Sequence, residues 1–270
     1  MSEILKAVLF GIVEGITEWL PISSTGHMIL LDEFVRLEMS PAFVSMFLVV
    51  IQLGAIMAVV LLYFDKLWPF GRGLRLRAGK AALWAKIMTA CVPAAVVGLL
   101  LDDWIDEHFY NPWTVAVMLI VFGIGFIWIE NYNKNQQPKT VSLEAVSYRD
   151  AFLVGLFQLV AAVFPGTSRS GSTILGSIAL GWSREVAAEF TFFLAVPVMF
   201  GASVLKVAKH GLVFDREESA VLAAGMLVSF AVSIVVIKLL MAYIKKHDFK
   251  IFGWYRIVLG AVVIAYFALR

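Results

Sequence analysis

Six long apolar runs, each close to the length of a membrane-crossing helix, constrain the fold of this chain more than any other feature. They cover about residues 42 to 64, 83 to 101, 112 to 130, 186 to 209, 219 to 241 and 251 to 269. A hydrocarbon core about 30 Å thick requires about 20 apolar residues in a helix. The chain is 61% hydrophobic and 16% charged, whereas a soluble domain is about 25% charged. We therefore expect a single all-α, polytopic membrane domain over residues 1 to 270.

Each half of the chain opens with a shorter apolar segment that is interrupted by a proline and a polar cluster. These openings are residues 4 to 38 and 151 to 182. A shift of 144 positions aligns them in the following pairs: Gly11 with Gly155, Glu14 with Gln158, Pro21 with Pro165, Ser23 with Thr167, and Ser24 with Ser168. We interpret this as an internal repeat, with one copy at about residues 1 to 135 and the other at about 145 to 270.

The interrupted openings do not suit a simple membrane crossing, because irregular backbone facing lipid leaves polar groups without partners. We interpret both as re-entrant helix-loop-helix hairpins that enter and leave on one side. Each half then adds three transmembrane helices, an odd number, so the second half must be inserted upside down. The expected fold is two inverted-topology repeats, each a re-entrant hairpin plus three transmembrane helices, a plan known from transporters.

The connections between the runs indicate an orientation, because Lys and Arg are enriched in cytoplasmic loops. Residues 65 to 80, 131 to 149 and 242 to 250 are basic connections that this topology places on one face. Residues 102 to 107 are acidic and lack Lys and Arg, so we place them outside with both termini. The connection at 206 to 216 is basic but also falls outside. The tips of the two hairpins then meet near mid-membrane, the first entering from the outer face.

Charge and cysteine content exclude several functions. The formal net charge is +2 and no basic stripe with interleaved aromatics occurs, so we expect no nucleic-acid partner. Cys91 is the only cysteine, which excludes an intramolecular disulfide, and we expect a packed core thiol. The amino terminus lacks the pattern of a signal peptide, so we expect it to remain in the mature protein.

Two glutamates in the first opening are candidate functional residues. Glu14 and Glu18 are four positions apart and project from one face of a helix. An acidic residue at the centre of a membrane helix costs about 2.5 to 3.5 kcal/mol, so the pair requires a partner or a water-filled cavity. A functional site explains this placement. The alternative is a structural ion pair, or an interfacial helix whose glutamates face water.

Hydroxyl groups follow the proline of the first opening. Pro21 should end one helix, and Ser23, Ser24 and Thr25 can cap a new helix that starts near His27. The free N–H groups and positive dipole end of a helix start form a pocket of the kind that phosphates occupy. The alternative is a polar turn that satisfies its own backbone, with His27 as a hydrogen-bonded structural residue.

The second opening repeats this design in the segment PGTSRSGST, which runs from Pro165 to Thr173 and contains Arg169. The guanidinium fork matches phosphate oxygens and stays charged. A lone arginine among Ser, Thr and Gly at membrane depth therefore indicates an anionic ligand. A salt bridge to Glu14 or Glu18 is the competing role, and both roles can hold at once.

These segments carry a family resemblance. EGITEWLPISSTGH, from Glu14 to His27, and PGTSRSGST resemble the two signatures of bacterial undecaprenyl-pyrophosphate phosphatases of the bacitracin-resistance type. The similarity covers most of the chain and includes the segments IQLGAI and REVAAEFTFFLAVP. Trp19 stands where the family commonly has Phe. Two long signatures in the right order make this resemblance specific.

The resemblance implies hydrolysis of undecaprenyl pyrophosphate to undecaprenyl phosphate and inorganic phosphate, assisted by a divalent cation, Mg²⁺ or Ca²⁺. This reaction recycles the carrier lipid of peptidoglycan synthesis. The implied location is the bacterial inner (cytoplasmic) membrane, where the site takes a polyprenyl diphosphate lipid from the bilayer and opens to the periplasmic side. The sequence leaves the oligomeric state open, a homodimer included. An inverted-repeat lipid flippase or anion transporter is the alternative function.

On this interpretation the expected catalytic residues are Glu14, Glu18, Ser24, His27 and Arg169. Ser24 is the preferred nucleophile, activated by a carboxylate or by His27, and His27 as nucleophile or proton donor is the rival. Glu14 and Glu18 either ligate the cation or supply a general base. The groups expected to contact phosphate oxygens come from both polar loops: Ser23, Thr25, Thr167, Ser168, Arg169 and Ser170.

Overall fold

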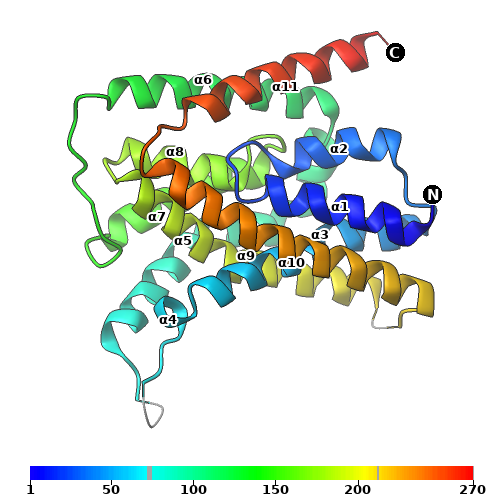
Figure 1. Cartoon of the computed structure of the whole chain (residues 1–270), viewed down its shortest axis with the longest axis horizontal. Helices are drawn as coiled ribbons and strands as arrows, with labels where there is room; N and C mark the ends of the chain where they lie inside the picture. Colours follow the sequence, from blue (N-terminus) through cyan, green and yellow to red (C-terminus); the bar gives the residue numbers. More distant parts are fainter. Residues whose placement is uncertain (72–74, 212, 270) are drawn as a thin grey trace.

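The computed structural model describes residues 1 to 71, 75 to 211 and 213 to 269. Within these ranges the regular secondary structure is helical, and β-type pairing is limited to isolated bridges. The helices are α1 (Glu3–Thr17), α2 (Ser24–Phe34), α3 (Pro41–Leu62), α4 (Phe64–Leu67), α5 (Ala78–Phe109), α6 (Pro112–Tyr132), α7 (Tyr148–Val163), α8 (Arg169–Ala179), α9 (Arg184–His210), α10 (Arg216–Ile244) and α11 (Lys250–Ala268). The all-α prediction is confirmed (Figure 1).

Six helices of the described residues are long and apolar enough to cross a membrane, namely α3, α5, α6, α9, α10 and α11. They coincide with the six apolar runs of the sequence, and their most apolar stretches have mean hydropathies of 1.8 to 2.6. Because lipid accommodates this much apolar helix surface and water does not, the chain is a multi-pass membrane protein.

One boundary differs from the sequence prediction. The acidic segment at residues 102 to 107, expected as a connection, is helical and continues α5 to Phe109. No proline or glycine occurs there to end the helix, so it runs on until Asn111 caps α6 by accepting the Thr114 N–H over 3.0 Å. The connection between α5 and α6 is therefore only residues 110 and 111.

Two pairs of shorter helices correspond to the interrupted openings of the two halves. α1 and α2 have 15 and 11 residues, and α7 and α8 have 16 and 11. Each is shorter than the about 20 residues that a crossing needs. Pro21 lies between α1 and α2, and Pro165 lies between α7 and α8, as predicted. Each pair is thus a helical hairpin with a polar loop at its tip.

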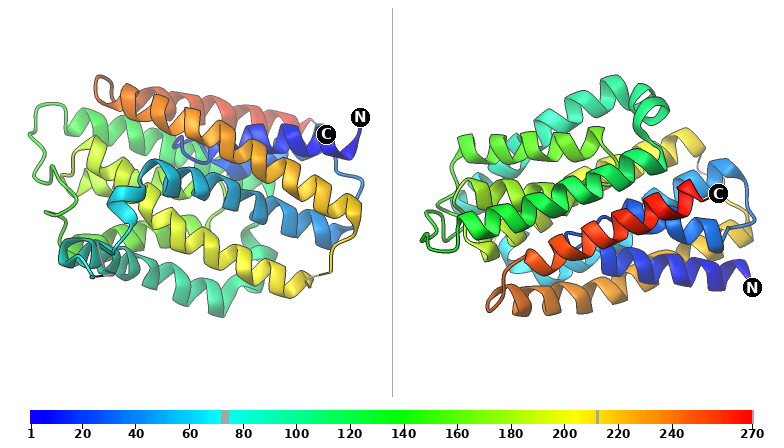
Figure 2. Two further views of the ribbon diagram at one scale, coloured as in Figure 1. Left: turned by 60° about the horizontal axis from the view of Figure 1, so that its bottom comes forward. Right: turned by 90° about the horizontal axis from the view of Figure 1, so that it is seen from above.

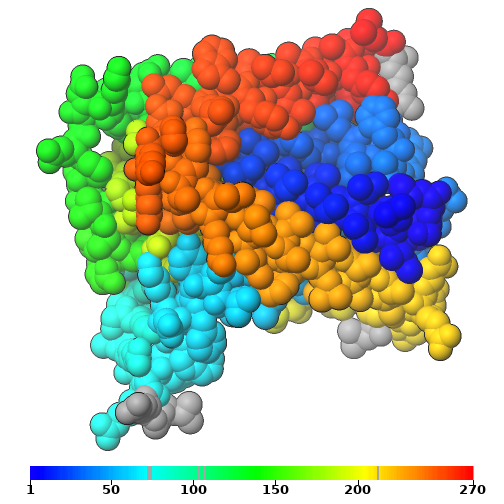
Figure 3. Space-filling view, in the orientation of Figure 1, coloured from blue at the N-terminus to red at the C-terminus, as the bar shows by residue number. Residues whose placement is uncertain are grey.

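Each hairpin packs mainly on a long helix from the other half of the sequence. α1 lies along α10, α7 lies along α5, and α6 lies along α11. Figures 1 and 2 place α1 and α2 toward the end of the molecule that holds both chain termini, and α7 and α8 toward the opposite end. In the space-filling view α1 is exposed between α10 and α11 (Figure 3). The loops of the two hairpins therefore approach each other inside the bundle.

Glycines allow these helices to approach closely. A Cβ added at Gly11 would lie 2.6 Å from the Gly225 carbonyl oxygen on α10, and one at Gly155 would lie 2.5 Å from the Ala90 carbonyl oxygen on α5. Real Cβ atoms do not come this near to backbone. The equivalent glycines of the two hairpins thus make equivalent contacts with the opposite half.

Glycines inside apolar helices are expected at close contacts between helices, and this prediction for Gly123, Gly125, Gly176 and Gly201 gives a mixed result. Gly123 faces Gly253 where α6 crosses α11, and a Cβ on either would lie 2.7 Å from the other's carbonyl oxygen. Gly125 and Gly176 also have close neighbours, so the prediction is confirmed for these three. Gly201 has no neighbour within 4 Å among the described residues, and there the prediction is wrong because its side of α9 faces outward.

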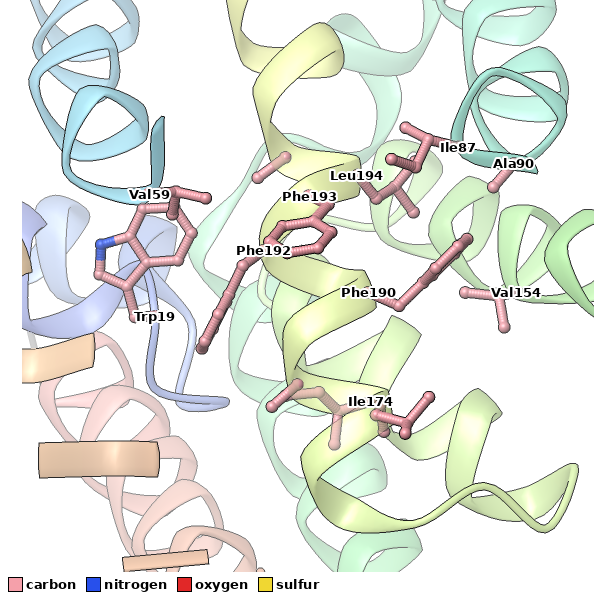
Figure 4. Close-up of a cluster of buried hydrophobic side chains, with 14 of the residues drawn as sticks. Trp19, Val59, Ile87, Ala90, Val154, Ile174, Phe190, Phe192, Phe193 and Leu194 are labelled. Carbon is pink, nitrogen blue, oxygen red and sulfur yellow. The ribbon is translucent and has the colours of Figure 1, made fainter. Parts of the chain in front are cut away.

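The largest hydrophobic cluster surrounds α9 and anchors the first loop. The Trp19 ring packs edge-on against Phe192, with ring centroids 5.3 Å apart, and Phe193 follows on the same helix (Figure 4). Trp19 is fully buried, so the indole fixes the backbone next to Glu18. Cys91 is a buried free thiol in the same cluster, as predicted.

Candidate functional site

The tips of the two hairpins have the same unusual backbone geometry. Ser23 and Ser168 both have left-handed backbones, with φ of 74° and 69°, and each is the N-cap of the following helix. The Ser23 hydroxyl accepts the Gly26 N–H over 3.3 Å, and the Ser168 hydroxyl accepts the Gly171 N–H over 3.1 Å. Positive φ is uncommon for non-glycine residues, and residues with such strained backbones occur often at functional sites.

This geometry corrects the alignment of the two repeats at the residues that cap α2 and α8. The predicted pairing joined Ser23 with Thr167 and Ser24 with Ser168, whereas the caps pair Ser23 with Ser168 and so Ser24 with Arg169. The cause is one extra residue in the second loop. One residue separates Pro21 from its cap, and two residues, the first a glycine with φ of 89°, separate Pro165 from its own. The candidate nucleophile and the candidate phosphate clamp thus hold equivalent positions, each the first residue of its helix.

Glu18 joins these two residues. The Ser24 hydroxyl donates to Glu18 Oε2 over 2.8 Å, and Arg169 Nη2 donates to Glu18 Oε1 over 2.6 Å. The Glu18 side chain is 7% exposed and the Arg169 side chain 15%. The salt bridge predicted from the sequence as the competing role of Arg169 is present, with Glu18 as the partner, although 151 positions separate the two residues in the sequence.

A cavity of about 170 Å³ opens beside this ion pair. Its lining includes Glu18, Ser24 and Arg169, together with Thr25 and Gln52. Gln52 is an amide within an apolar run, where the sequence alone predicts a contact between helices, and the structure places it on the wall of this cavity. The space lies where the positive ends of α2 and α8 meet, which favours a negatively charged ligand.

Three buried polar atoms around this site have no hydrogen-bond partner among the described residues: Glu14 Oε1, Thr167 Oγ1 and Arg169 Nη1. Burial of an unpaired polar group is costly, and of an unpaired charge more so. Glu14 is 1% exposed and interacts with Glu18 through its side chain. The free acidic and basic atoms suit a ligand that carries both an anion and a cation.

The donor set fits a divalent cation. Two buried carboxylates face one arginine, so the side chains of Glu14, Glu18 and Arg169 carry one unbalanced negative charge when ionised. Among the described residues no group of three or more His, Cys, Asp and Glu could hold a metal. Mg²⁺ needs no such group, because it is commonly bound by one or two carboxylates together with substrate phosphates and water.

Both ring nitrogens of His27 have hydrogen-bond partners other than Ser24. Its Nδ1 lies 2.7 Å from the Ser23 carbonyl oxygen, and its Nε2 lies 2.7 Å from the hydroxyl of Tyr255 on α11. A carbonyl only accepts, so Nδ1 carries the proton, and in neutral imidazole Nε2 then accepts from the tyrosine. The structure pairs Ser24 with Glu18, and both ring nitrogens of His27 with groups outside the cavity.

The hydroxyls of the second loop divide between the cavity and the backbone. Ser168 lines the cavity, and its Oγ lies 3.2 Å from that of Ser170. The Ser170 hydroxyl also donates to the Glu18 carbonyl over 3.0 Å, which ties the second hairpin to the first loop. The Thr167 side chain is fully buried. Contact of these groups with phosphate stays a prediction.

Arg256 is a residue that our sequence interpretation missed. It lies on α11, is fully buried, and donates hydrogen bonds to carbonyl oxygens of both loops. The signal was available, because Arg256 stands inside the last apolar run, and a charge at membrane depth is a functional candidate by the same rule that singled out Arg169.

Fold and site together define a multi-pass membrane protein with a buried carboxylate, hydroxyl and arginine site between two hairpin loops. The model of the bacitracin resistance protein BacA family matches residues 7 to 262, and the chain belongs to that family. It is similar to the undecaprenyl-diphosphatase of Desulfitobacterium hafniense, with 62% identity over 272 residues that cover 100% of this chain and 98% of the relative. The undecaprenyl-diphosphatase 1 of Clostridium acetobutylicum is 60% identical over 98% of this chain and 97% of its own length. The undecaprenyl-diphosphatase of Enterococcus faecalis is 56% identical over 98% of each chain.

Proposed function

We propose that this protein hydrolyses undecaprenyl diphosphate to undecaprenyl phosphate and inorganic phosphate, and so regenerates a carrier lipid for peptidoglycan synthesis. The names of the full-length relatives support this substrate. The single observation that carries the proposal is the position of Glu18, which accepts from Ser24 Oγ and from Arg169 Nη2 at the wall of one cavity. A base, a hydroxyl nucleophile and a phosphate clamp are thereby within reach of one phosphoryl group.

In the first step Ser24 Oγ attacks the terminal phosphorus. The Oγ–P bond forms as the bond from phosphorus to the bridging oxygen breaks, and undecaprenyl phosphate leaves with that electron pair. Glu18 takes the Ser24 proton, and Arg169 turns its free Nη1 toward the equatorial oxygens, where negative charge is spread. Glu18 then passes this proton to the departing undecaprenyl phosphate. Water attacks the phosphoserine, Glu18 accepts the proton of the water and returns it to Ser24 Oγ as the Oγ–P bond breaks, and inorganic phosphate leaves.

Glu14 is the residue that we assign to the divalent cation, with Glu18 as its neighbour. A bound Mg²⁺ or Ca²⁺ would neutralise charge on the diphosphate oxygens. The unpartnered Glu14 Oε1 supports this assignment. His27 acts as a positioning residue, since its hydrogen bond to the Ser23 carbonyl stabilises the strained turn directly before Ser24.

The architecture that we propose is two inverted repeats whose hairpins are re-entrant. The equivalent caps at Ser23 and Ser168 and the equivalent glycine contacts at Gly11 and Gly155 support a duplicated unit. The open ends of the two hairpins lie toward opposite ends of the bundle (Figures 1 and 2), which supports insertion from opposite sides. The basic connections at the far end from the termini support a cytoplasmic location for that end. We assign the protein to the bacterial inner membrane, with the site open to the periplasmic side.

The deciding experiment is phosphate release by the purified protein in detergent. With undecaprenyl diphosphate and Mg²⁺ we expect stoichiometric inorganic phosphate and undecaprenyl monophosphate, and with the Ser24→Ala variant we expect background release. Opposed hairpins also suit a lipid flippase. A protein that binds the lipid diphosphate and never cleaves it would overturn the hydrolase proposal in favour of that carrier.

A further inference from the structure

Arg256 is an arginine buried at the junction of the two hairpins. Its residue exposure is 0%, and the hydrogen-bond acceptors around it among the described residues are backbone carbonyl oxygens. It donates to the Pro21 carbonyl over 3.2 Å, to the Gly166 carbonyl over 3.0 Å and to the Thr167 carbonyl over 2.7 Å. One guanidinium therefore binds the backbone of the first loop and of the second.

These carbonyls belong to the backbone that carries the candidate site. Pro21 lies between Glu18 and Ser24, and Gly166 and Thr167 lie directly before the turn that presents Arg169. Loop carbonyls at membrane depth have no helical N–H partner and little access to water, so a side chain must supply donors. Arginine is suited to this task, because its planar fork offers five N–H donors in fixed directions.

We propose that Arg256 is a positioning residue for the reaction proposed above: it holds the two loops in the register that brings Ser24 and Glu18 to Arg169. This inference rests on the proposed function. Arg256 does not line the cavity, and it acts through the loop backbone. Displacement of a reacting group by about 1 Å can reduce the rate about 100-fold, so small changes in this register have large effects on kcat.

A glycine provides a second way to test the contact. A Cβ at Gly171 would lie 2.8 Å from Arg256 Nη1, so Ala at this position pushes against the guanidinium. Gly26 holds the equivalent position on α2, where the nearest atom to an added Cβ is a Leu119 methyl at 3.4 Å. Only Gly171 of these two equivalent glycines abuts Arg256, and a Cβ there would also lie 3.1 Å from Ser168 Cβ.

The first experiment compares Arg256→Lys with Arg184→Lys. Lysine keeps the charge but cannot reach several carbonyls with fixed geometry, so we expect kcat for phosphate release to fall about 100-fold with KM changed less than about threefold. Arg184, whose side chain is partly exposed and donates to the buried Glu130 over 2.9 Å, is the control for loss of an arginine fork elsewhere in the fold. Its variant should melt earlier and keep kcat. Arg256→Lys with kcat within twofold of the unmodified protein would overturn the proposal.

The second experiment is a double-mutant cycle with Arg169→Lys. If Arg256 acts by positioning Arg169, the second substitution adds less than about threefold to the loss of the first, because groups that act as a unit are not additive. Independent losses that multiply would show a general effect on stability and overturn the proposal. If Arg256→Lys does not give a monodisperse protein, the two glycine variants provide the test. We expect Gly171→Ala to lose at least tenfold more kcat than Gly26→Ala. Equal losses of kcat refute the inference.

The test is separable from that of the function. If the unmodified protein releases no phosphate, the proposed function fails, and Arg256 is judged by calorimetric binding of pyrophosphate with Mg²⁺. Weaker binding by Arg256→Lys, with unchanged binding by Arg184→Lys, then supports the positioning role. Equal binding by all three proteins, or no binding by any, overturns it.

Discussion

Arg169 and Glu18 form an ion pair of 2.6 Å between the first residue of one hairpin's second helix and the loop of the other hairpin. The partners come from opposite halves of the sequence, so the pair closes the site across the centre of the bundle. Arg169 uses Nη2 for this contact, while its buried Nη1 has no partner among the described residues. The same side chain can therefore hold Glu18 and a phosphate oxygen at once.

Arg169→Lys is expected to lower kcat at least about 100-fold. An ammonium keeps the charge but lacks the fork that reaches two groups together. The measurement is steady-state phosphate release in detergent. A variant with unchanged turnover would remove Arg169 from the phosphate clamp.

Ser24→Ala is expected to reduce phosphate release to background and to abolish a covalent intermediate. Alanine removes the oxygen that we assign as nucleophile, and Glu18 keeps its ion pair with Arg169. Rapid quenching with substrate radiolabelled at the terminal phosphate tests whether the protein becomes labelled. Mass spectrometry of the quenched protein then tests whether the phosphate is on serine. Near-normal turnover in the variant, or label on a histidine, would refute the assignment.

His27→Asn is expected to retain at least about tenfold more activity than His27→Ala. The asparagine amide can replace the Nδ1–H donor to the Ser23 carbonyl, whereas alanine leaves that carbonyl only the longer hydrogen bond, of 3.4 Å, from the backbone N–H of residue 27. Tyr255→Phe removes the partner of Nε2 and should cost less than about fivefold. If Asn and Ala variants are equally inactive, His27 takes part in the chemistry itself.

Removal of divalent cations by a chelator is expected to stop phosphate release, and added Mg²⁺ should restore it. Glu14→Gln keeps the shape of the side chain but removes the charge that binds a hard cation. We expect this variant to need at least about tenfold more Mg²⁺ for half-maximal activity. A titration curve that coincides with that of the unmodified protein would exclude Glu14 as a ligand.

Gly155→Ala is expected to destabilise the fold by about 1 to 3 kcal/mol, because its Cβ would overlap the Ala90 carbonyl oxygen and overpacking has that cost. Gly201→Ala is the control, with no neighbour within 4 Å among the described residues. Alanine there should leave stability equal or slightly higher, since glycine is the poorer helix former. Thermal unfolding in detergent gives both values, and equal melting temperatures would contradict the packing argument.

The sequence predicted the spans well because length and hydropathy alone decide them. From charged residues that are costly at membrane depth and the hydroxyls near them, the sequence singled out Glu18, Ser24 and Arg169, which the structure brings together at one cavity, and their chemical roles stay predictions. It misaligned the caps by one residue. The reason is that residue types alone do not predict the left-handed backbone conformation of Ser168, which makes this residue the cap. The sequence interpretation missed Arg256, although a charge inside the last apolar run was a signal, and only the structure shows that its partners are the carbonyl oxygens of both loops.

The exchange of hairpins between halves limits how the molecule can move. Separation of residues 1 to 135 from residues 145 to 270 as two bodies would pull α1 from α10 and α7 from α5 together. Both interfaces are glycine-lined surfaces in direct backbone contact, at Gly11 with Gly225 and at Gly155 with Ala90. Each half holds a hairpin of the other half. A rocking motion that carried a lipid between leaflets would therefore have to break both interfaces. Hydrolysis at a site that stays in place between the two loops does not require this movement.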